Sequence, residues 1–293
     1  MTAVDIDSLR LNRRTCPSKL KLIDAVELAA AEKILDFMLE HFDHAIKSLD
    51  TLNKVAAVIE PRGFTADNTL YAQSVCPDEI NHEISDITEL LTEYLDNVFH
   101  LGGLAGIPFT GNTGFGAFSH HVPEDGHLFV MMAPHVGISS DFKVGSYDRI
   151  GQDGAGSACG AAVGAYSFCC DRSSQPIPNV ADSPDDYQMC YIINKINDVF
   201  EDKISVYPTE NERQVALVKE TYKIGKTMLD NILTIKGWGG SLSKLTILTG
   251  IQINMANPHD DYFLPLSFEI KSKDGTTEDV FEEAFGHRAE NSI

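Results

Sequence analysis

The fold class is decided by residues 69 to 79, which read Thr69-Leu-Tyr-Ala-Gln-Ser-Val75-Cys76-Pro77-Asp78-Glu79. The first seven residues are mostly apolar and predict a short buried strand. Asp78 is a favourable helix N-cap, and apolar residues recur behind it at helical spacing as far as Val98. We therefore expect a strand, a turn and a helix, with Cys76 and Asp78 in the turn.

A second strand of the same kind is predicted from His127 to Ala133, which reads His-Leu-Phe-Val-Met-Met-Ala. Such a continuous apolar run suits the centre of a parallel sheet. The strand ends in Pro134-His135-Val-Gly137, so a metal-competent side chain follows it directly. In open α/β sheets, ligands bind at the carboxyl ends of the strands, and the two strand ends are therefore expected to share a site.

Further elements are expected on both sides of these strands. The glycine-rich segment 102–116 is predicted to be a structured loop and not a phosphate-binding loop, because no Gly-Lys-Ser/Thr follows it. Helices are predicted over 20–52 (two, broken near 41–44), 187–204, 210–235 and 279–285, and strands over 244–254 and 262–270. The predicted fold class is α/β, with a central, mainly parallel sheet flanked by helices and with helical additions at both ends.

The expected domain organisation is one globular unit. Residues 1–60 are assigned to an N-terminal arm, mobile over 1–18, and to helices that pack on the core. Residues 61–293 are assigned to the α/β domain. The whole chain has 293 residues, which is within the range of one large domain.

The composition excludes several classes of partner. The chain carries 43 acidic and 23 basic residues, and its formal net charge is −20. An acidic surface repels phosphate backbones, so we expect no nucleic-acid partner. No run of about 18 apolar residues occurs, and no membrane span is expected. No signal peptide is evident, which favours a cytoplasmic protein, or one of an organellar stroma if a transit peptide was removed.

One cysteine lies in an unusual setting. The stretch Asp153-Gly-Ala-Gly-Ser-Ala-Cys159-Gly-Ala-Ala-Val-Gly-Ala-Tyr166 is dominated by small residues. Ser157 is a plausible N-cap, which would place Cys159 in the first turn of a buried helix, where the positive helix end favours a thiolate. Taken alone, this segment is equally compatible with a packing thiol and with a reactive one.

Cys76, His135 and Cys159 all lie at the ends of predicted elements. Two thiolates and one imidazole suit zinc, and three protein ligands leave a fourth position open, as in catalytic zinc sites. Their separations of 59 and 24 positions match no zinc-knuckle pattern, so spacing alone is a weak signal. The same residues also allow a metal-free cysteine hydrolase, with Cys159 as nucleophile and His135 as base.

Four short pieces, in the right order, resemble the carbonic anhydrase domain of the limiting-CO2-inducible protein B/C family, the theta class, which is related in fold to β-class carbonic anhydrases. The resemblance covers about one third of the chain. The pieces are Val75-Cys76-Pro77-Asp78-Glu79, the segment from Leu101-Gly102-Gly103 to Phe118-Ser119-His120, Ala133-Pro134-His135 and Ser157-Ala158-Cys159-Gly160-Ala161.

The resemblance implies a lyase that reversibly hydrates CO2 to bicarbonate. It implies a zinc ion on Cys76, His135 and Cys159, with zinc hydroxide as the nucleophile, and a homodimer with the site at or near the subunit interface. Asp78 matches the aspartate of the β-class Cys-x-Asp motif and would orient the hydroxide, although it could also simply cap its helix.

The sequence departs from the β-class pattern at Ile80, where that class has the arginine that pairs with the aspartate. Arg149 is our first choice for the missing arginine and Arg62 the second, because an ionised aspartate needs a bidentate donor. His120 is a candidate proton relay, since histidine titrates near neutrality; a backbone-bonded structural role is at least as good for His121. The departure at Ile80 also leaves open a non-catalytic zinc scaffold or CO2/bicarbonate-responsive protein of the same fold.

Overall fold

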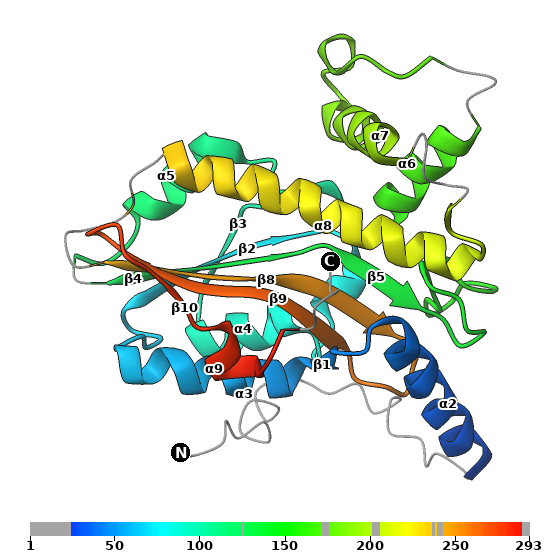
Figure 1. Cartoon of the computed structure of the whole chain (residues 1–293), viewed down its shortest axis with the longest axis horizontal. Coiled ribbons are helices and arrows are strands. Elements are labelled where there is room, and N and C mark those ends of the chain that lie inside the picture. Colours follow the sequence, from blue (N-terminus) through cyan, green and yellow to red (C-terminus); the bar gives the residue numbers. More distant parts are fainter. Residues whose placement is uncertain are drawn as a thin grey trace.

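Eight strands form one mixed sheet at the centre of the molecule (Figure 1). The computed structural model describes residues 25–124, 126–171, 176–200, 206–235, 238 and 243–288. Within these ranges the strand order is β1-β9-β8-β4-β2-β3, and β5 and β10 pair with β8 and β9. The strands are β1 (Ile46–Lys47), β2 (Thr69–Val75), β3 (Val98–His100), β4 (His127–Ala133), β5 (His135–Ile138), β8 (Lys244–Met255), β9 (Tyr262–Ser272) and β10 (Thr277–Asp279).

The middle of the sheet is parallel. β4 lies between β2 and β8 and runs parallel to both, and β5 continues alongside β8 in the same sense. β9 closes the sheet antiparallel to β8, and β1 and β10 are antiparallel to β9. Residues Leu128 to Ala133 of β4 are buried, as a central parallel strand requires. The prediction of a mainly parallel α/β sheet with 127–133 near its centre is confirmed.

Helices cover both faces of this sheet (Figure 1). On one face lie α5 (Gly111–His120) and α8 (Glu210–Ile235), and on the other α3 (Ser48–Ile59), α4 (Ile87–Leu95) and α9 (Phe281–Phe285). Two hydrophobic cores follow, one on each face. The remaining helices, α2 (Ala25–His41), α6 (Gly160–Cys170) and α7 (Tyr187–Phe200), lie at one end of the sheet, where α6 packs on α7. None of the helices in the described ranges is long and apolar enough to cross a membrane.

The predicted helix behind Asp78 is wrong in its extent. The chain instead forms η3 (Glu79–His82), then α4, and then strand β3. Asp96 has a φ of 73°, which ends α4, and Val98 pairs with Tyr71 of β2. Val98 fits the apolar stripe of the helix by spacing alone; in the structure it extends the sheet, because β2 offers it an unpaired edge.

The glycine-rich segment 102–116 was also predicted incorrectly, because most of its second half is helical. It contains the short 3-10 helix η4 (Leu104–Gly106) and the first turns of α5. Glycine disfavours helix by about 1 kcal/mol per residue. Here Phe115 and Phe118, both fully buried on one side of α5, outweigh that preference.

The helices before residue 60 follow the expected pattern where the chain is described. The predicted break near residues 41–44 is confirmed, since α2 ends at His41 and α3 begins at Ser48. The predicted arm, residues 1–18, lies outside the described residues. α3 packs on α4 and α9, and β1 joins the sheet through β9. The assignment of residues 1–60 to an arm and core-packing helices, and of 61–293 to the α/β domain of one globular unit, stays a prediction.

Candidate metal centre

Cys76 and His135 are brought together by the register of two parallel strands. β2 and β4 pair from Thr69 with His127 to Val75 with Ala133, so both strands end at the same level. Cys76 follows the first strand directly, and His135 follows the second after Pro134 and opens β5. Both side chains therefore lie at one edge of the sheet, as expected from their positions after the two strands.

A loop that folds back onto β5 delivers the third candidate ligand. Gly137 donates to the carbonyl of Ala158 at 3.0 Å and accepts from the amide of Gly145 at 2.9 Å. A Cβ atom at Gly137 would lie 2.6 Å from the Ser146 carbonyl oxygen and 2.9 Å from the Ala158 Cβ. The absence of a side chain at Gly137 therefore permits the approach that places Cys159 beside His135.

The N-terminus of α6 lies two residues later than predicted from Ser157. Ser157 belongs to β7 (Gly156–Ser157), which pairs antiparallel with β6 (Ser146–Tyr147). This pairing keeps Ser157 extended, and Cys159 itself is the N-cap of α6. A cysteine therefore lies at the start of this helix, as expected, but one residue before its first turn.

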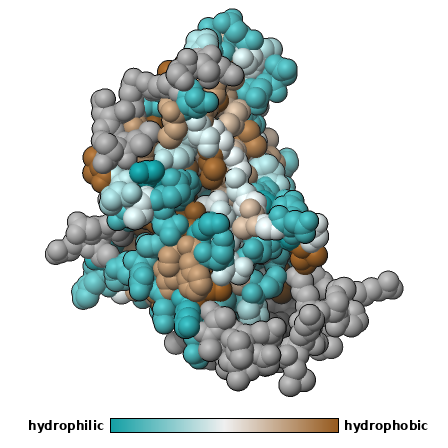
Figure 2. Space-filling view, turned by 90° about the vertical axis from the view of Figure 1, so that its right-hand side faces the viewer, coloured by the Kyte–Doolittle hydropathy of each residue, from teal (hydrophilic) through white to brown (hydrophobic). Residues whose placement is uncertain are grey.

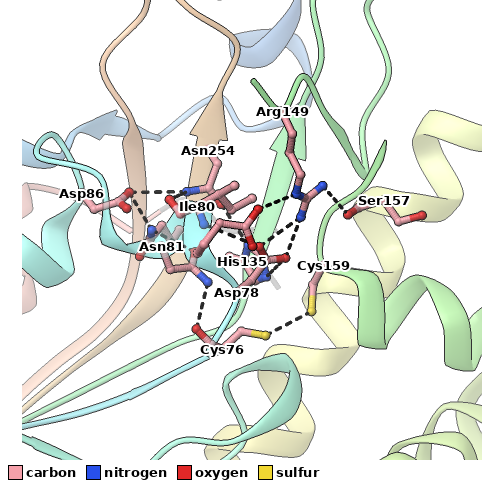
Figure 3. Close-up of polar contacts among 12 residues, drawn as sticks. Cys76, Asp78, Ile80, Asn81, Asp86, His135, Arg149, Ser157, Cys159 and Asn254 are labelled. Atoms are coloured by element: carbon pink, nitrogen blue, oxygen red, sulfur yellow. Dashed lines mark hydrogen bonds and ion pairs between the residues drawn. The ribbon is translucent and has the colours of Figure 1, made fainter. Parts of the chain in front are cut away.

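The three candidate ligands form one buried group (Figure 3). One ligand atom from each of Cys76, His135 and Cys159 lies within 4.8 Å of the others, and the two sulfur atoms are 3.6 Å apart. Each residue is at most 4% exposed. Nε2 of His135 is buried and makes no hydrogen bond within the described part of the chain. A buried imidazole nitrogen without a hydrogen bond beside two thiols fits a group that binds a metal ion.

The two thiols differ in their acidity. The pKa of Cys159 is lowered, first by the hydrogen bond from Cys76 and then by the amides of Ala162 and Ala161 at the start of α6. The same contact with Cys159, together with burial, raises the pKa of Cys76. Of the two thiols, Cys159 is therefore the one that loses its proton more readily. This direction agrees with the expectation that a helix start favours a thiolate.

Asp78 lies next to this group and is held by Arg149 (Figure 3). Nη2 of Arg149 is 3.0 Å from each carboxylate oxygen, and its Nη1 and Nε donate to the Ser157 carbonyl at 3.1 Å and to Glu79 at 2.7 Å. Oδ2 of Asp78 is 3.8 Å from Nε2 of His135. Asp78 also caps η3, because its Oδ1 accepts from the amide of Ile80 at 3.5 Å. Both interpretations of Asp78 from the sequence are thus sterically compatible.

Two residues considered from sequence lie elsewhere. Arg62, the alternative partner of Asp78, pairs instead with Glu278 and Glu283, so that alternative is wrong. His120 is the exposed last residue of α5. In the chain, only the segment 121–126 separates it from the amino end of β4, whereas Cys76 and His135 follow the carboxyl ends of β2 and β4. The helix runs back along the sheet, away from the metal-competent group. His120 is therefore not positioned as a proton relay there, and His121 follows it.

Sequence reasoning missed a set of buried polar residues around His135. Asn254, on β8, places its Oδ1 2.9 Å from Nδ1 of His135. Gln252, two positions earlier on the same strand, donates to Asp86 at 2.7 Å. A signal was present, because two amides spaced by two interrupt an apolar strand near its carboxyl end and must share one face.

These features define a class of protein, namely an α/β protein with a buried, metal-competent Cys-His-Cys group at the carboxyl edge of a mainly parallel sheet. A family model described as limiting CO2-inducible proteins B/C beta carbonic anhydrases matches residues 45–272. The chain belongs to this family. A comparison with curated proteins gives no match.

Solved structures agree with this assignment. PtLCIB4, a homolog of the limiting CO2-inducible protein LCIB, is 27% identical with a TM-score of 0.72, over 84% of this chain and 98% of that chain. A point mutant of PtLCIB4 gives 26% identity and a TM-score of 0.74, over 84% and 97% of the two chains. LCIB gives 20% identity and a TM-score of 0.62, over 82% and 96%, which supports the fold.

Proposed function

We propose that this chain is a zinc-dependent carbonic anhydrase that interconverts CO2 and bicarbonate. One observation carries the proposal: the buried Cys76, His135 and Cys159 group lies beside a carboxylate held by an arginine, and Nε2 of His135 makes no hydrogen bond to any described residue. Membership in a family described as β carbonic anhydrases supports the same reaction. Two thiolates and an imidazole favour zinc among the common divalent ions.

In this proposal each residue of the site has its own role. When bound, zinc supplies a Lewis acid that lowers the pKa of a coordinated water toward 7. Asp78 accepts a hydrogen bond from the attacking water and directs its lone pair toward CO2. Arg149 fixes the orientation of Asp78, because the guanidinium binds both carboxylate oxygens. The buried setting of the three ligands restricts access of bulk water.

A cysteine hydrolase is less well supported by the geometry. The Cys159 sulfur contacts the Cys76 sulfur, and none of the hydrogen bonds described joins it to His135. A nucleophile and its base need to be within hydrogen-bond reach. A non-catalytic scaffold that keeps the metal remains as an outcome of the test.

The test combines elemental analysis with stopped-flow CO2 hydration on the purified chain. We expect about one zinc per chain and a hydration rate above that of buffer. Cys159→Ser should lose both, whereas Asp78→Asn should keep the zinc and lose the rate. Bound zinc without CO2 hydration above the rate of buffer would show that the chain is a non-catalytic scaffold. An active chain free of zinc would exclude a zinc enzyme.

We also propose that the chain forms a homodimer, as similarity to the family implies. Ile150, adjacent to Arg149, is 82% exposed, and Ile84 is 45% exposed. Figure 2 faces the carboxyl edge of the sheet and shows hydrophobic residues in separate small patches among hydrophilic ones. Light scattering should give twice the chain mass, and Ile150→Glu tests whether this side chain is covered in the dimer.

A further inference from the structure

A buried polar network contacts His135 at Nδ1, the ring nitrogen that a metal on Nε2 would leave free. Asn254, fully buried on β8, places Oδ1 2.9 Å from this nitrogen. The contact alone does not say which atom donates, because an imidazole nitrogen can be donor or acceptor and an amide can be turned by 180°. The surroundings of Asn254 decide both questions.

The orientation of the Asn254 amide is fixed by two acceptors. Its Nδ2 lies 3.2 Å from the carbonyl oxygen of Ile80 and 3.4 Å from Oδ1 of Asp86. A main-chain carbonyl can only accept, so the atom facing it must be the NH2 group. Oδ1 of Asn254 therefore faces His135, and Nδ1 of His135 must be the donor. The neutral ring then carries its lone pair on Nε2, the buried nitrogen for which the described residues offer no hydrogen bond.

The next layer holds Asn254 in place. Oδ1 of Asp86 also accepts from Nε2 of Gln252 at 2.7 Å, and its Oδ2 accepts from the amide of Glu83 at 3.0 Å. Asp86 and Gln252 are fully buried, and Gln252 also donates to Asn81 at 3.1 Å. Asn81 in turn donates to the carbonyl of Cys76 at 3.1 Å. The network thus reaches two of the three candidate ligands from one side.

We infer that Asn254 is a positioning residue of the metal centre: it holds His135 as the Nδ1–H tautomer, and the Ile80 carbonyl and Asp86 hold Asn254. This inference rests on the proposed metal site. Outer partners of metal-bound histidine fix the ring and raise its basicity, and losing one typically costs 10- to 100-fold in affinity. Ile80, which stands where the β-class has arginine, contributes through its main chain.

The test compares Asn254→Leu with Thr249→Val. Thr249 lies on the same strand, is fully buried and hydrogen-bonds Tyr222 at 2.8 Å, so its variant also loses a buried polar contact. Zinc affinity is measured by competition with a chromogenic chelator. We expect a 10- to 100-fold weaker affinity in Asn254→Leu and a change of less than about twofold in Thr249→Val. Equal affinities in both variants and the unchanged chain would overturn the inference.

A second measurement needs no variant at Asn254. Nitrogen NMR of the metal-free chain, at alkaline pH where imidazole is neutral, distinguishes the two tautomers of His135, whose signal is assigned by its loss in His135→Gln. The Nδ1–H form is expected, and the Nε2–H form would overturn the inference even if Asn254→Leu fails to fold. If the unchanged chain binds no zinc, the proposed function fails instead, whatever the tautomer.

Discussion

Asp78 and Arg149, 71 positions apart, form a two-point ion pair, with Nη2 of the arginine 3.0 Å from both carboxylate oxygens. The same guanidinium donates to the carbonyl of Ser157, two residues before Cys159. One loop therefore supplies a candidate metal ligand and also fixes the carboxylate beside it. In the proposed mechanism, Arg149 thereby takes the place of the arginine that the β-class has at the position of Ile80.

Arg149→Gln is expected to lower kcat/KM for CO2 hydration by 10- to 100-fold while zinc content stays the same, because Asp78 loses its orientation but the three ligands remain. Arg62→Gln is the matched control, since Arg62 also bridges two carboxylates, at the C-terminal end of the fold. The kcat/KM of Arg62→Gln should stay within about twofold of that of the unchanged chain. A fully active Arg149→Gln would remove Arg149 from the mechanism.

Metal removal is expected to destabilise the folded chain. A ligand that binds only the native state adds about 4 kcal/mol to the free energy of unfolding at 1,000 times its Kd. Thermal unfolding with and without a chelator measures this difference. In Cys159→Ser the two melting temperatures should coincide, because the ligand set is incomplete. A chelator effect of the same size in this variant would place the metal elsewhere.

Gly137→Ala should destabilise the protein by about 1–3 kcal/mol and weaken zinc binding, because the new Cβ would meet the Ser146 carbonyl at 2.6 Å. Gly160→Ala is the control. Gly160 is the first residue of α6, beside Cys159, and an added Cβ there meets nothing within 4 Å. Urea unfolding should show it neutral or slightly stabilised. Equal losses in both variants would contradict the role given to Gly137.

The buried pair Asp86 and Asp261 predicts a pH dependence of stability. Burial raises the pKa of Asp261 to about 6, and burial followed by repulsion from Asp261 raises the pKa of Asp86. A raised carboxyl pKa means that the folded state holds a proton that the unfolded state releases above about pH 4. The stabilisation that the protonated carboxyls give to the folded state is therefore complete at low pH and is lost as the pH rises through about 6.

The comparison that isolates this effect is between the unchanged chain and Asp261→Asn, both metal-free. From pH 4 to pH 7 the unchanged chain should lose about 2 kcal/mol more of its free energy of unfolding than the variant. Glu83 also lies near the pair and adds repulsion that raises both pKa values. Parallel stability curves for the two chains would show that Asp261 titrates normally.

Much of the sheet could be predicted from local pattern. Strands 69–75 and 127–133 are apolar runs whose bounds agree with β2 and β4. Their ends carry Cys76 and His135, and parallel pairing in register suffices to bring these together. The helix predicted through Val98 and the loop predicted over 102–116 were wrong for a common reason. The spacing of apolar residues and the glycine content indicate only the local preference for helix or loop. The pairing of Val98 with the open edge of β2 and the burial of Phe115 and Phe118 depend on tertiary contacts.

For the candidate site too, some features could be predicted from the sequence and others could not. The types of its residues were evident from sequence, because only a few side chains are good metal ligands and they stand at the ends of elements. The position of His120 could not be predicted, since it depends on the direction in which α5 runs along the sheet. Asn254 was missed because its partner, His135, is 119 positions away.

By itself, the sequence determined the fold class and the two central strands, because apolar periodicity is a property of short segments. Cys76, His135 and Cys159 were named as candidate metal ligands from the sequence through the resemblance to the family. Only the tertiary structure decided that Arg149 and not Arg62 holds Asp78, that Cys159 caps α6, and that Asn254 faces His135. The contacts of Arg149 with Asp78 and of Asn254 with His135 join segments far apart in the chain. Such contacts form only where close packing, as at Gly137, brings the backbones together.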